Sequence, residues 1–286
     1  MKQFASLAPM LLIIFMSFST KTTMTNNNSF PFDVKVNGQG THSIIFIPGF
    51  SCSGEVWNET KSQYEKDFTC YTLTMAGFAD SKPQPNPTFK NWETGIANFI
   101  KENKIEKPII IGHSMGGGLA LAIAADYPEL IDKIIVVDAL PCLPALMNPT
   151  FKSKENNACT EIVNQMSSMP SDQFYQMQKM SIPYLLEDTS KQELVVSWSV
   201  KSDRKTFAEM YCDFSNTDLR EKIETIKCPA LILLEPYFKN VKPAIEEQYR
   251  NLKTANLQYA NKGLHFIMYD DKEWYFTQVN NFIKGE

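Results

Sequence analysis

The segment IIIGHSMGGGLALAIA, residues 109–124, decides the fold of this 286-residue chain. An apolar, β-branched run leads into Gly112, His113 and Ser114, and three further glycines open a stretch of alanine and leucine. The first part is typical of a buried strand and the second of a helix. Gly112 and Gly116 lie two positions on either side of Ser114, where a Cβ would collide with the strand or the helix. The segment therefore predicts a tight turn that presents the hydroxyl of Ser114.

This turn matches the pattern glycine-x-serine-x-glycine, in which the serine is a nucleophile. The helix after it points its N-terminal amides to the place where negative charge develops during acyl transfer. A glycine-rich turn with no chemistry is the alternative interpretation. The apolar strand before Ser114 and the small-residue helix after it favour the nucleophile.

On both sides of this segment, runs typical of strands alternate with amphipathic stretches typical of helices. Strands are expected at residues 43–48, 68–74, 108–111, 133–139, 228–234 and 257–260, and helices at 56–67, 89–105, 116–127, 241–252 and 270–285. The helix at 89–105 has one apolar stripe, formed by Trp92, Ile96, Phe99 and Ile100. Apolar strands that alternate with helices indicate an α/β fold with a mostly parallel central sheet and helices on both faces.

The alternation stops between residues 141 and 226. Helices are expected there at 170–180, 187–198 and 202–214, each with Ser, Asp or Thr near its start. The pattern predicts a core of residues 31–140 and 227–286, interrupted by a helical cap of residues 141–226. The cap is rich in methionine and aromatic residues. Packing on the core explains most of them, and an apolar lid over a pocket is the functional interpretation.

The N-terminus predicts export. Residues 1–19 combine Lys2, a short apolar centre and a small-x-small cleavage site, which is the pattern of a signal peptide. Residues 20–30 form a polar leader. An uncleaved N-terminal membrane anchor is the alternative, but the apolar centre is shorter than the roughly 20 residues that a span needs. We therefore expect a secreted or periplasmic protein with no stable membrane span in its mature form.

Composition excludes some partners. The formal net charge of −4 leaves no basic surface for nucleic acid, and no Cys/His spacing is typical of a zinc site. The six cysteines could pair in an oxidising compartment or remain as packed thiols. Cys142 and Cys159 flank one irregular segment, which makes them the first pair to test. The oligomeric state is left open.

Three further stretches carry a resemblance to a known family. They are IIFIPGFSCSGEVW (44–57), TLTMAGFADSKP (72–83) and GLHFIMYDDKEWYFTQVNNFI (263–283). Together with the Ser114 turn, they resemble the oxyanion loop, a glycine-rich loop and the histidine segment of the α/β-hydrolase superfamily. Residues 43–284 thus resemble members of that superfamily with a helical cap after the sixth strand. The resemblance implies an α/β-hydrolase fold, and neither a metal nor an organic cofactor.

The base of such a site is found by elimination, since the chain has three histidines. His113 adjoins Ser114, and neighbouring side chains diverge on a turn of this kind. His42 lies before the first clear strand of the core. In this fold the order along the chain is serine, acid, histidine, and only His265 satisfies it.

The acid has two candidates. Asp138 lies at the end of the strand expected at 133–139, and Glu235 follows the strand expected at 228–234. The family most often uses an aspartate beyond the later strand, and this chain has none there. Some branches take the acid from the earlier strand end, which favours Asp138 over Glu235. Asp80 precedes Ser114, so it is interpreted as a loop-stabilising residue.

The resemblance also implies the oxyanion hole and the activity. The donors would be the backbone N–H groups of Phe50 and Met115. The hydroxyls of Ser51 and Ser53 could add contacts there, but we interpret them as solvating the loop. The predicted activity is hydrolysis of a small carboxylic ester or lactone with an apolar acyl group, through an acyl-enzyme on Ser114. The alternatives are an amide or carbon–carbon bond hydrolase or a perhydrolase with the same three residues, and a ligand-binding protein of low turnover.

Overall fold

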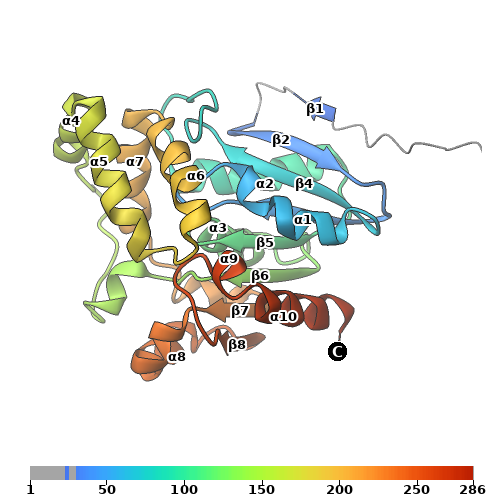
Figure 1. The fold of residues 1–286 in the computed structure, drawn as a ribbon. Helices are drawn as coiled ribbons and strands as arrows, with labels where there is room; N and C mark the ends of the chain where they lie inside the picture. Colours follow the sequence, from blue (N-terminus) through green and yellow to red (C-terminus); the bar gives the residue numbers. More distant parts are fainter. Residues whose placement is uncertain (1–22, 26–29, 286) are drawn as a thin grey trace, which may run out of the picture.

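A single mixed sheet forms the centre of the protein (Figure 1). The computed structural model describes residues 23–25 and 30–285, and in them the sheet has eight strands in the order β1-β2-β4-β3-β5-β6-β7-β8. The strands are β1 (Thr23–Thr25), β2 (Phe32–Asn37), β3 (His42–Ile47), β4 (Phe68–Met75), β5 (Ile109–His113), β6 (Lys133–Val137), β7 (Ala230–Leu234) and β8 (Ala255–Tyr259). The pairs β1–β2 and β2–β4 are antiparallel, and the others are parallel.

Helices cover both faces of this sheet. They are α1 (Asn58–Tyr64), α2 (Phe89–Glu102), α3 (Met115–Asp126), α8 (Lys242–Tyr249), α9 (Ile267–Asp270) and α10 (Lys272–Lys284). The central strand β5 is buried on both sides, because Ile110 packs into the core with α2, α3 and α8 while Ile109 and Ile111 pack into the core with α1 and α10. The predicted α/β fold with a mostly parallel sheet is thus confirmed.

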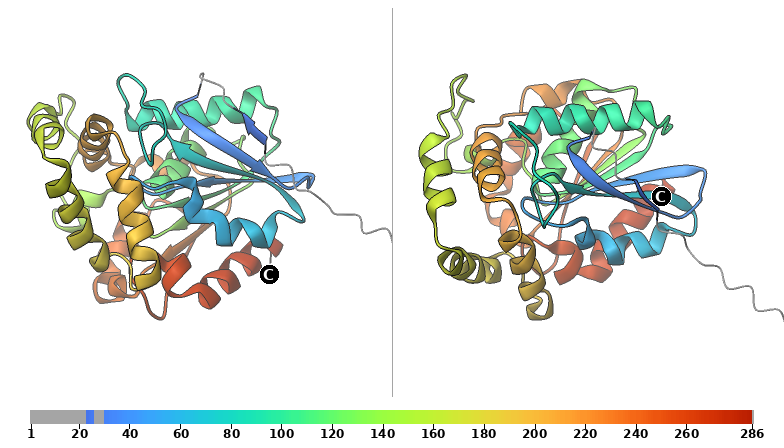
Figure 2. Two further views of the ribbon diagram at one scale, coloured as in Figure 1. Left: turned by 45° about the horizontal axis from the view of Figure 1, so that its top comes forward. Right: turned by 90° about the horizontal axis from the view of Figure 1, so that it is seen from above.

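A group of helices lies between β6 and β7. It contains η2 (Leu143–Leu146), α4 (Thr160–Ser168), α5 (Ser171–Ser181), η3 (Ile182–Tyr184), α6 (Thr189–Val200), α7 (Arg204–Ser215) and η4 (Lys222–Thr225). Both views of Figure 2 show α4 to α7 as a layer beside the sheet, and we call residues 141–226 the cap. Two of its helices begin at acidic N-caps, where Asp188 accepts from the amide of Ser190 and Asp203 from that of Thr206.

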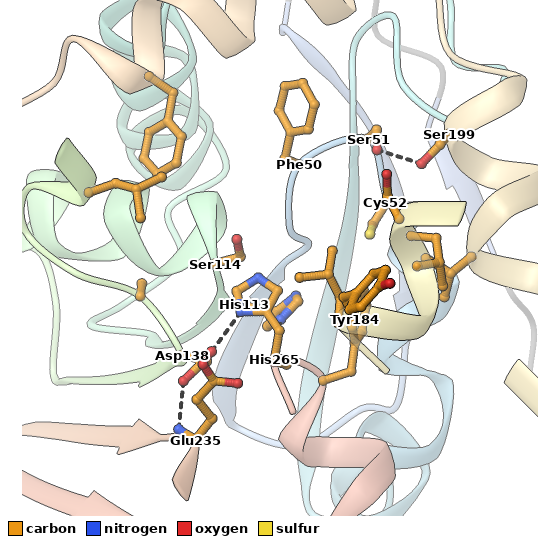
Figure 3. Close-up of a pocket in the computed structure, with 18 of the residues that line it drawn as sticks. Phe50, Ser51, Cys52, His113, Ser114, Asp138, Tyr184, Ser199, Glu235 and His265 are labelled. Carbon is orange, nitrogen blue, oxygen red and sulfur yellow. Dashed lines mark hydrogen bonds and ion pairs between the residues drawn. The ribbon is translucent and has the colours of Figure 1, made fainter. Parts of the chain in front are cut away.

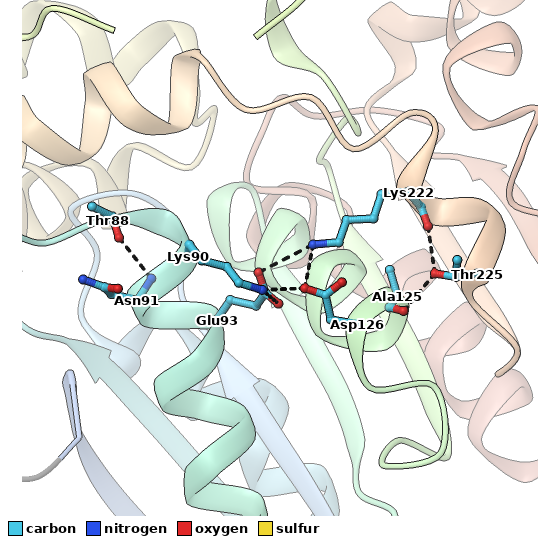
Figure 4. A network of polar contacts seen from close by, with 8 residues as sticks. All are labelled: Thr88, Lys90, Asn91, Glu93, Ala125, Asp126, Lys222 and Thr225. Atoms are coloured by element: carbon cyan, nitrogen blue, oxygen red, sulfur yellow. Dashed lines mark hydrogen bonds and ion pairs between the residues drawn. The ribbon is translucent and has the colours of Figure 1, made fainter. Parts of the chain in front are cut away.

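Polar contacts fasten the end of the cap to the core (Figure 4). The ammonium of Lys222, in η4, lies 2.6 Å from a carboxylate oxygen of Asp126 at the end of α3, and Lys90 of α2 pairs with the same carboxylate. The hydroxyl of Thr225 donates to the carbonyl of Ala125 at 2.8 Å. The chain therefore enters β7 from a point that is fixed to both α2 and α3.

One disulfide lies within the cap. Cys159, just before α4, is bonded to Cys212 in α7 across 53 positions of sequence. Cys142 is a free, buried thiol, as are Cys52, Cys70 and Cys228. Cys142 and Cys159, which the sequence made the first pair to test, are therefore not bonded to each other. Cys142 lies at the start of the cap next to the core, where its backbone N–H donates to the side chain of Gln248 in α8, whereas Cys159 lies just before the outer helix α4.

We expect Cys212→Ala to lower the free energy of unfolding by about 2–4 kcal/mol, because the bond closes a long loop in the unfolded chain. Cys159→Ala should have the same effect, and the double variant no larger one, since each removes the same bond. Denaturant unfolding with and without a reducing agent measures this. A reducing agent that destabilises the double variant as much as the wild type would contradict the prediction.

Some elements were not predicted. β2 was missed because its burial alternates, with Asp33 exposed between buried Phe32 and Val34. His42 is the first residue of β3 and does not precede it. Of the polar leader, Thr23–Thr25 forms β1, and α4 and α9 were also not anticipated.

The signal peptide predicted at 1–19 lies outside the described residues, so export stays a proposal. Among the described helices, none combines the length and apolarity needed to cross a bilayer.

Candidate active site

Ser114 lies on the strained turn that the sequence predicts. Its backbone has φ 54° and ψ −122°, between the last residue of β5 and the first of α3. A Cβ on Gly112 would lie 2.2 Å from the carbonyl oxygen of Gly116, and one on Gly116 would lie 2.4 Å from that of Ile47. The amide of Ser114 donates to the carbonyl of Val137 at 2.8 Å. Glycine is therefore required on both sides of the serine by contacts with the main chain.

His265 and Asp138 form a hydrogen-bonded pair beside Ser114 (Figure 3). The ring Nδ1 of His265 lies 2.6 Å from Oδ2 of Asp138, and the Asp138 side chain is 1% exposed. The other carboxylate oxygen of Asp138 accepts from the backbone N–H of Glu235 at 2.7 Å. Ser114 and His265 line one cavity, and Figure 3 shows the serine side chain next to the imidazole. The structure thus brings together the three residues that the sequence singled out.

Glu235 is hydrogen-bonded to this pair through its backbone N–H and not through its carboxylate. Its side chain lines the cavity close to Asp138 (Figure 3). Burial, and then the negative charge of Asp138, raises the pKa of Glu235 to about 7. A carboxyl group with such a pKa is only partly charged at neutral pH, so it is a poor partner for an imidazolium.

His113 contacts both the ring and the main chain of His265. Its ring is buried, lies 4.6 Å from the ring of His265, and donates from Nε2 to the main-chain carbonyl of His265 at 3.0 Å. Burial, and then the nearby charge of His265, lowers the pKa of His113 well below its usual range. It is therefore neutral, with the proton on Nε2. The sequence excluded His113 as the base and did not predict this contact, which joins residues 152 positions apart.

Two main-chain donors flank Ser114. Within residues 30–285, the N–H groups of Phe50 and Met115 donate to no other group. Met115 is the first residue of α3, and Phe50 lies in a turn in which the amide of Cys52 donates to the carbonyl of Gly49 at 3.2 Å. A Cβ on Gly49 would lie 3.3 Å from the Cβ of Ser114, so this turn touches the serine directly. The arrangement suits an oxyanion site.

Ser51 and Ser53 do not solvate the loop, so that interpretation is wrong. Both side chains are buried. The hydroxyl of Ser53 accepts from the amide of Glu55 and caps the short helix η1 (Gly54–Trp57). The hydroxyl of Ser51 is hydrogen-bonded to Ser199 of the cap.

The cavity above Ser114 has a volume of about 460 Å³. Core and cap both line it, and its apolar lining includes Phe50, Leu140, Leu146, Ile182, Val195, Phe207, Phe238 and Phe266. Three exposed tyrosines also line it: Tyr184 is 82% exposed, Tyr211 49% and Tyr237 57%. In the part of the chain that the structure describes, no three His, Cys, Asp or Glu side chains lie together as metal ligands would.

Comparison with protein families identifies the chain. Residues 42–233 match the family model of the alpha/beta hydrolase fold. The chain belongs to the α/β-hydrolase fold family. The resemblance seen in the sequence is therefore confirmed, and it extends from β3 through the Ser114 turn and the cap to β7.

Individual members of the α/β-hydrolase family are distant from this chain. It is 22% identical over 249 residues to a pimeloyl-[acyl-carrier protein] methyl ester esterase of Vibrio campbellii, which covers 86% of this chain and 95% of the relative. It is 29% identical over 106 residues to an uncharacterized protein of Mycobacterium bovis, but it spans only 31% of that relative's length, or about a third.

Solved structures share the fold. The enol-lactonase of Burkholderia xenovorans superposes with a TM-score of 0.73 at 14% identity, over 92% of this chain and all of that one (100%). A thermophilic esterase of Thermogutta terrifontis gives a TM-score of 0.73 at 14% identity, over 93% and 98% of the two chains. At such identity the likeness establishes the α/β-hydrolase architecture alone.

Proposed function

We propose that this protein is a serine hydrolase that cleaves a carboxylic ester or lactone through an acyl-enzyme on Ser114. The observation that carries the proposal is the buried Asp138–His265 hydrogen bond beside a serine on a strained turn. A serine nucleophile needs a base, and the base needs an acid to orient it. Relatives named as a methyl ester esterase and an enol-lactonase point to the same reaction class.

The proposed reaction has two steps. His265 takes the proton of Ser114, whose oxygen attacks the substrate carbonyl, and the N–H groups of Phe50 and Met115 bind the oxyanion. The leaving alcohol takes the proton from His265. A water molecule, deprotonated by the same imidazole, then attacks the acyl-enzyme and releases the acid. Asp138 keeps the Nδ1 proton of His265 in place, so that Nε2 is free to accept.

The substrate is inferred from the cavity. Its apolar lining favours an apolar acyl group of small to medium size, for which about 460 Å³ is sufficient. Ser114, His265 and Glu235 bring polar side chains together at one end of the cavity (Figure 3). We infer that this end of the cavity holds the ester bond and that the part under the cap holds the acyl chain.

The proposal is tested by labelling and by a substrate panel. A fluorophosphonate probe should modify Ser114 in the folded protein, and peptide mapping locates the label. A panel of p-nitrophenyl esters, lactones and amides then separates the reaction classes, with esters or lactones expected to turn over. A folded protein that resists the probe would refute an enzyme of this kind, and amide turnover that exceeds ester turnover would replace the substrate class.

The pH dependence follows from the groups around His265. Burial lowers its pKa, but the hydrogen bond to Asp138 and the charges of Asp138 and Glu235 outweigh this, so the pKa of His265 is raised. Because the base must be neutral, kcat/KM should be low in acid and rise through an apparent pKa above about 6.5, the usual value for histidine. Glu235 titrates in the same range, so the apparent value belongs to the pair.

Glu235→Gln should shift this rise to lower pH, because it removes a negative charge that favours the imidazolium. Glu246→Gln is the matched control, since Glu246 is exposed and paired with Lys242 on α8. Profiles of kcat/KM from pH 5 to 9 measure the shift. A rise that stays in place in Glu235→Gln, or moves to higher pH, would contradict the assignment of charges.

A further inference from the structure

The turn that carries Phe50 is bonded to the cap. Ser51 follows Phe50 directly, and its hydroxyl lies 2.7 Å from the hydroxyl of Ser199 in α6. Both residues line the cavity, but they are only 5% and 2% exposed, so the bond is largely shielded from bulk solvent. The bond joins residues 148 positions apart, one in the core and one in the cap (Figure 3).

Ser51 needs such support, because its backbone is strained. Its φ is 55°, a conformation that favours glycine. A residue in that region persists when its surroundings hold it there. The amide of Cys52, which donates to Gly49, closes the turn on the main-chain side. The hydrogen bond between the hydroxyls of Ser51 and Ser199 holds the turn through a side chain. Phe50 lies between Gly49, which accepts the first bond, and Ser51, which makes the second.

Phe50 is also held through its ring. The ring packs against Phe207 of α7 at a centroid distance of 4.6 Å, against Tyr211 of α7 at 5.9 Å and against Phe78 at 5.1 Å. Two of these three partners belong to the cap. The direction in which the N–H of Phe50 points is thus fixed from α6 and from α7.

The end of α6 is itself anchored, so it can act as a fixed support. The hydroxyl of Ser202 accepts from the amide of Ala79 at 3.0 Å, and the carbonyl of Lys201 accepts from the amide of Asp80 at 3.2 Å. Both donors lie in the core loop after β4, and both have positive φ. Ser199 therefore lies within one helical turn of Lys201 and Ser202, the residues that bond the cap to the core.

We propose that Ser199 is a positioning residue for the hydrolase reaction: through Ser51 it aims the N–H of Phe50 at the substrate oxyanion. This inference rests on the proposed function of Ser114 and Phe50. It makes the cap part of the machinery that stabilises the transition state, in addition to a cover of the cavity. Ser199 touches Ser51 and acts through the backbone of the turn.

The test is Ser199→Ala on the full chain with a p-nitrophenyl ester. We expect kcat to fall roughly tenfold with KM within about twofold, because an oxyanion contact strengthens in the transition state. The rate of Ser114 modification by a fluorophosphonate should fall in parallel. Ser197→Ala is the matched control, since Ser197 lies on the same helix and its hydroxyl donates to the carbonyl of Leu194 in that helix.

Ser51→Ala and the double variant complete a mutant cycle. If the two hydroxyls act through one bond, Ser51→Ala should lower kcat to a similar extent and the double variant no further. Should Ser199→Ala fail to fold, Ser51→Ala alone decides, by the same split between kcat and KM. Losses that multiply in the double variant, or a folded Ser199→Ala with wild-type kcat, would overturn the positioning role. A wild-type chain that hydrolyses nothing would instead refute the proposed function, and this inference with it.

Discussion

Ser114→Ala should abolish ester hydrolysis, with kcat lowered by roughly 10⁵- to 10⁶-fold, the loss that removal of a serine nucleophile causes when it acts as a unit with its base. Without the hydroxyl, His265 has no proton to take and the acyl-enzyme cannot form. The oxyanion donors and the cavity remain, so a small residual rate over water is expected. Binding of substrate should be nearly unchanged, because the serine contributes little to it.

The variant should keep the wild-type fold. Alanine and serine share a Cβ, so the strained backbone at φ 54° costs the same in both proteins. Ser62→Ala is a suitable control, since the hydroxyl of Ser62 is exposed and bonds to the carbonyl of Glu59 in its own helix. The measurement is kcat together with labelling by a fluorophosphonate, which Ser114→Ala should lose and Ser62→Ala should keep. Labelling that persists in a folded Ser114→Ala would place the nucleophile elsewhere.

The sequence predicts those parts of the site that local pattern determines. An apolar strand followed by closely spaced glycines predicts a strand, a tight turn and a helix for residues 109–124, and the structure shows the steric reason at Gly112 and Gly116. The strands on both sides of β5, β3 and β6, were predicted because each ends in a run of four buried apolar residues. β2 alternates and lies towards one edge of the sheet, so it gave a weaker signal.

Contacts between distant parts of the chain could not be predicted in this way. The Cys159–Cys212 bond depends on how α4 and α7 lie in space, and no spacing rule for cysteines encodes that. The same holds for the contact of His113 with the main chain of His265, and for the Ser51–Ser199 bond. One sign was visible beforehand: both His113 and Ser51 adjoin residues that the sequence had assigned to the reaction.

The choice of acid shows how geometry separates two candidates that the sequence left open. Asp138 and Glu235 end neighbouring strands, β6 and β7, so both carboxylates lie near His265. Asp138 has φ 50°, a backbone conformation that is rare for a non-glycine residue, and its two oxygens are both engaged. The amide of Glu235 is one of the groups that hold it. The backbone N–H of Glu235 thus helps to hold the Asp138 carboxylate, and a substitution of the Glu235 side chain leaves this hydrogen bond in place.

Asp138→Asn should therefore lower kcat by about 10³- to 10⁴-fold, whereas Glu235→Gln should lower it less than about tenfold. An asparagine keeps the shape but can present an amide N–H to Nδ1, which leaves the proton of His265 on Nε2 and removes the base that faces Ser114. The loss should persist at high pH, because it results from the wrong tautomer and not from titration. Glu235→Gln keeps the backbone N–H that donates to Asp138, so only the charge near His265 changes.

Steady-state kinetics of both variants with one ester, at pH 7 and pH 9, separate the two roles. The variants are matched, because each replaces a carboxylate by its amide on the wall of the same cavity. A larger loss in Glu235→Gln than in Asp138→Asn would mean that the imidazolium is held by the later carboxylate during the reaction. Equal, large losses would mean that the two carboxyl groups act as one unit, in which case the hydrogen bond from His265 to Asp138 is not sufficient to orient the base.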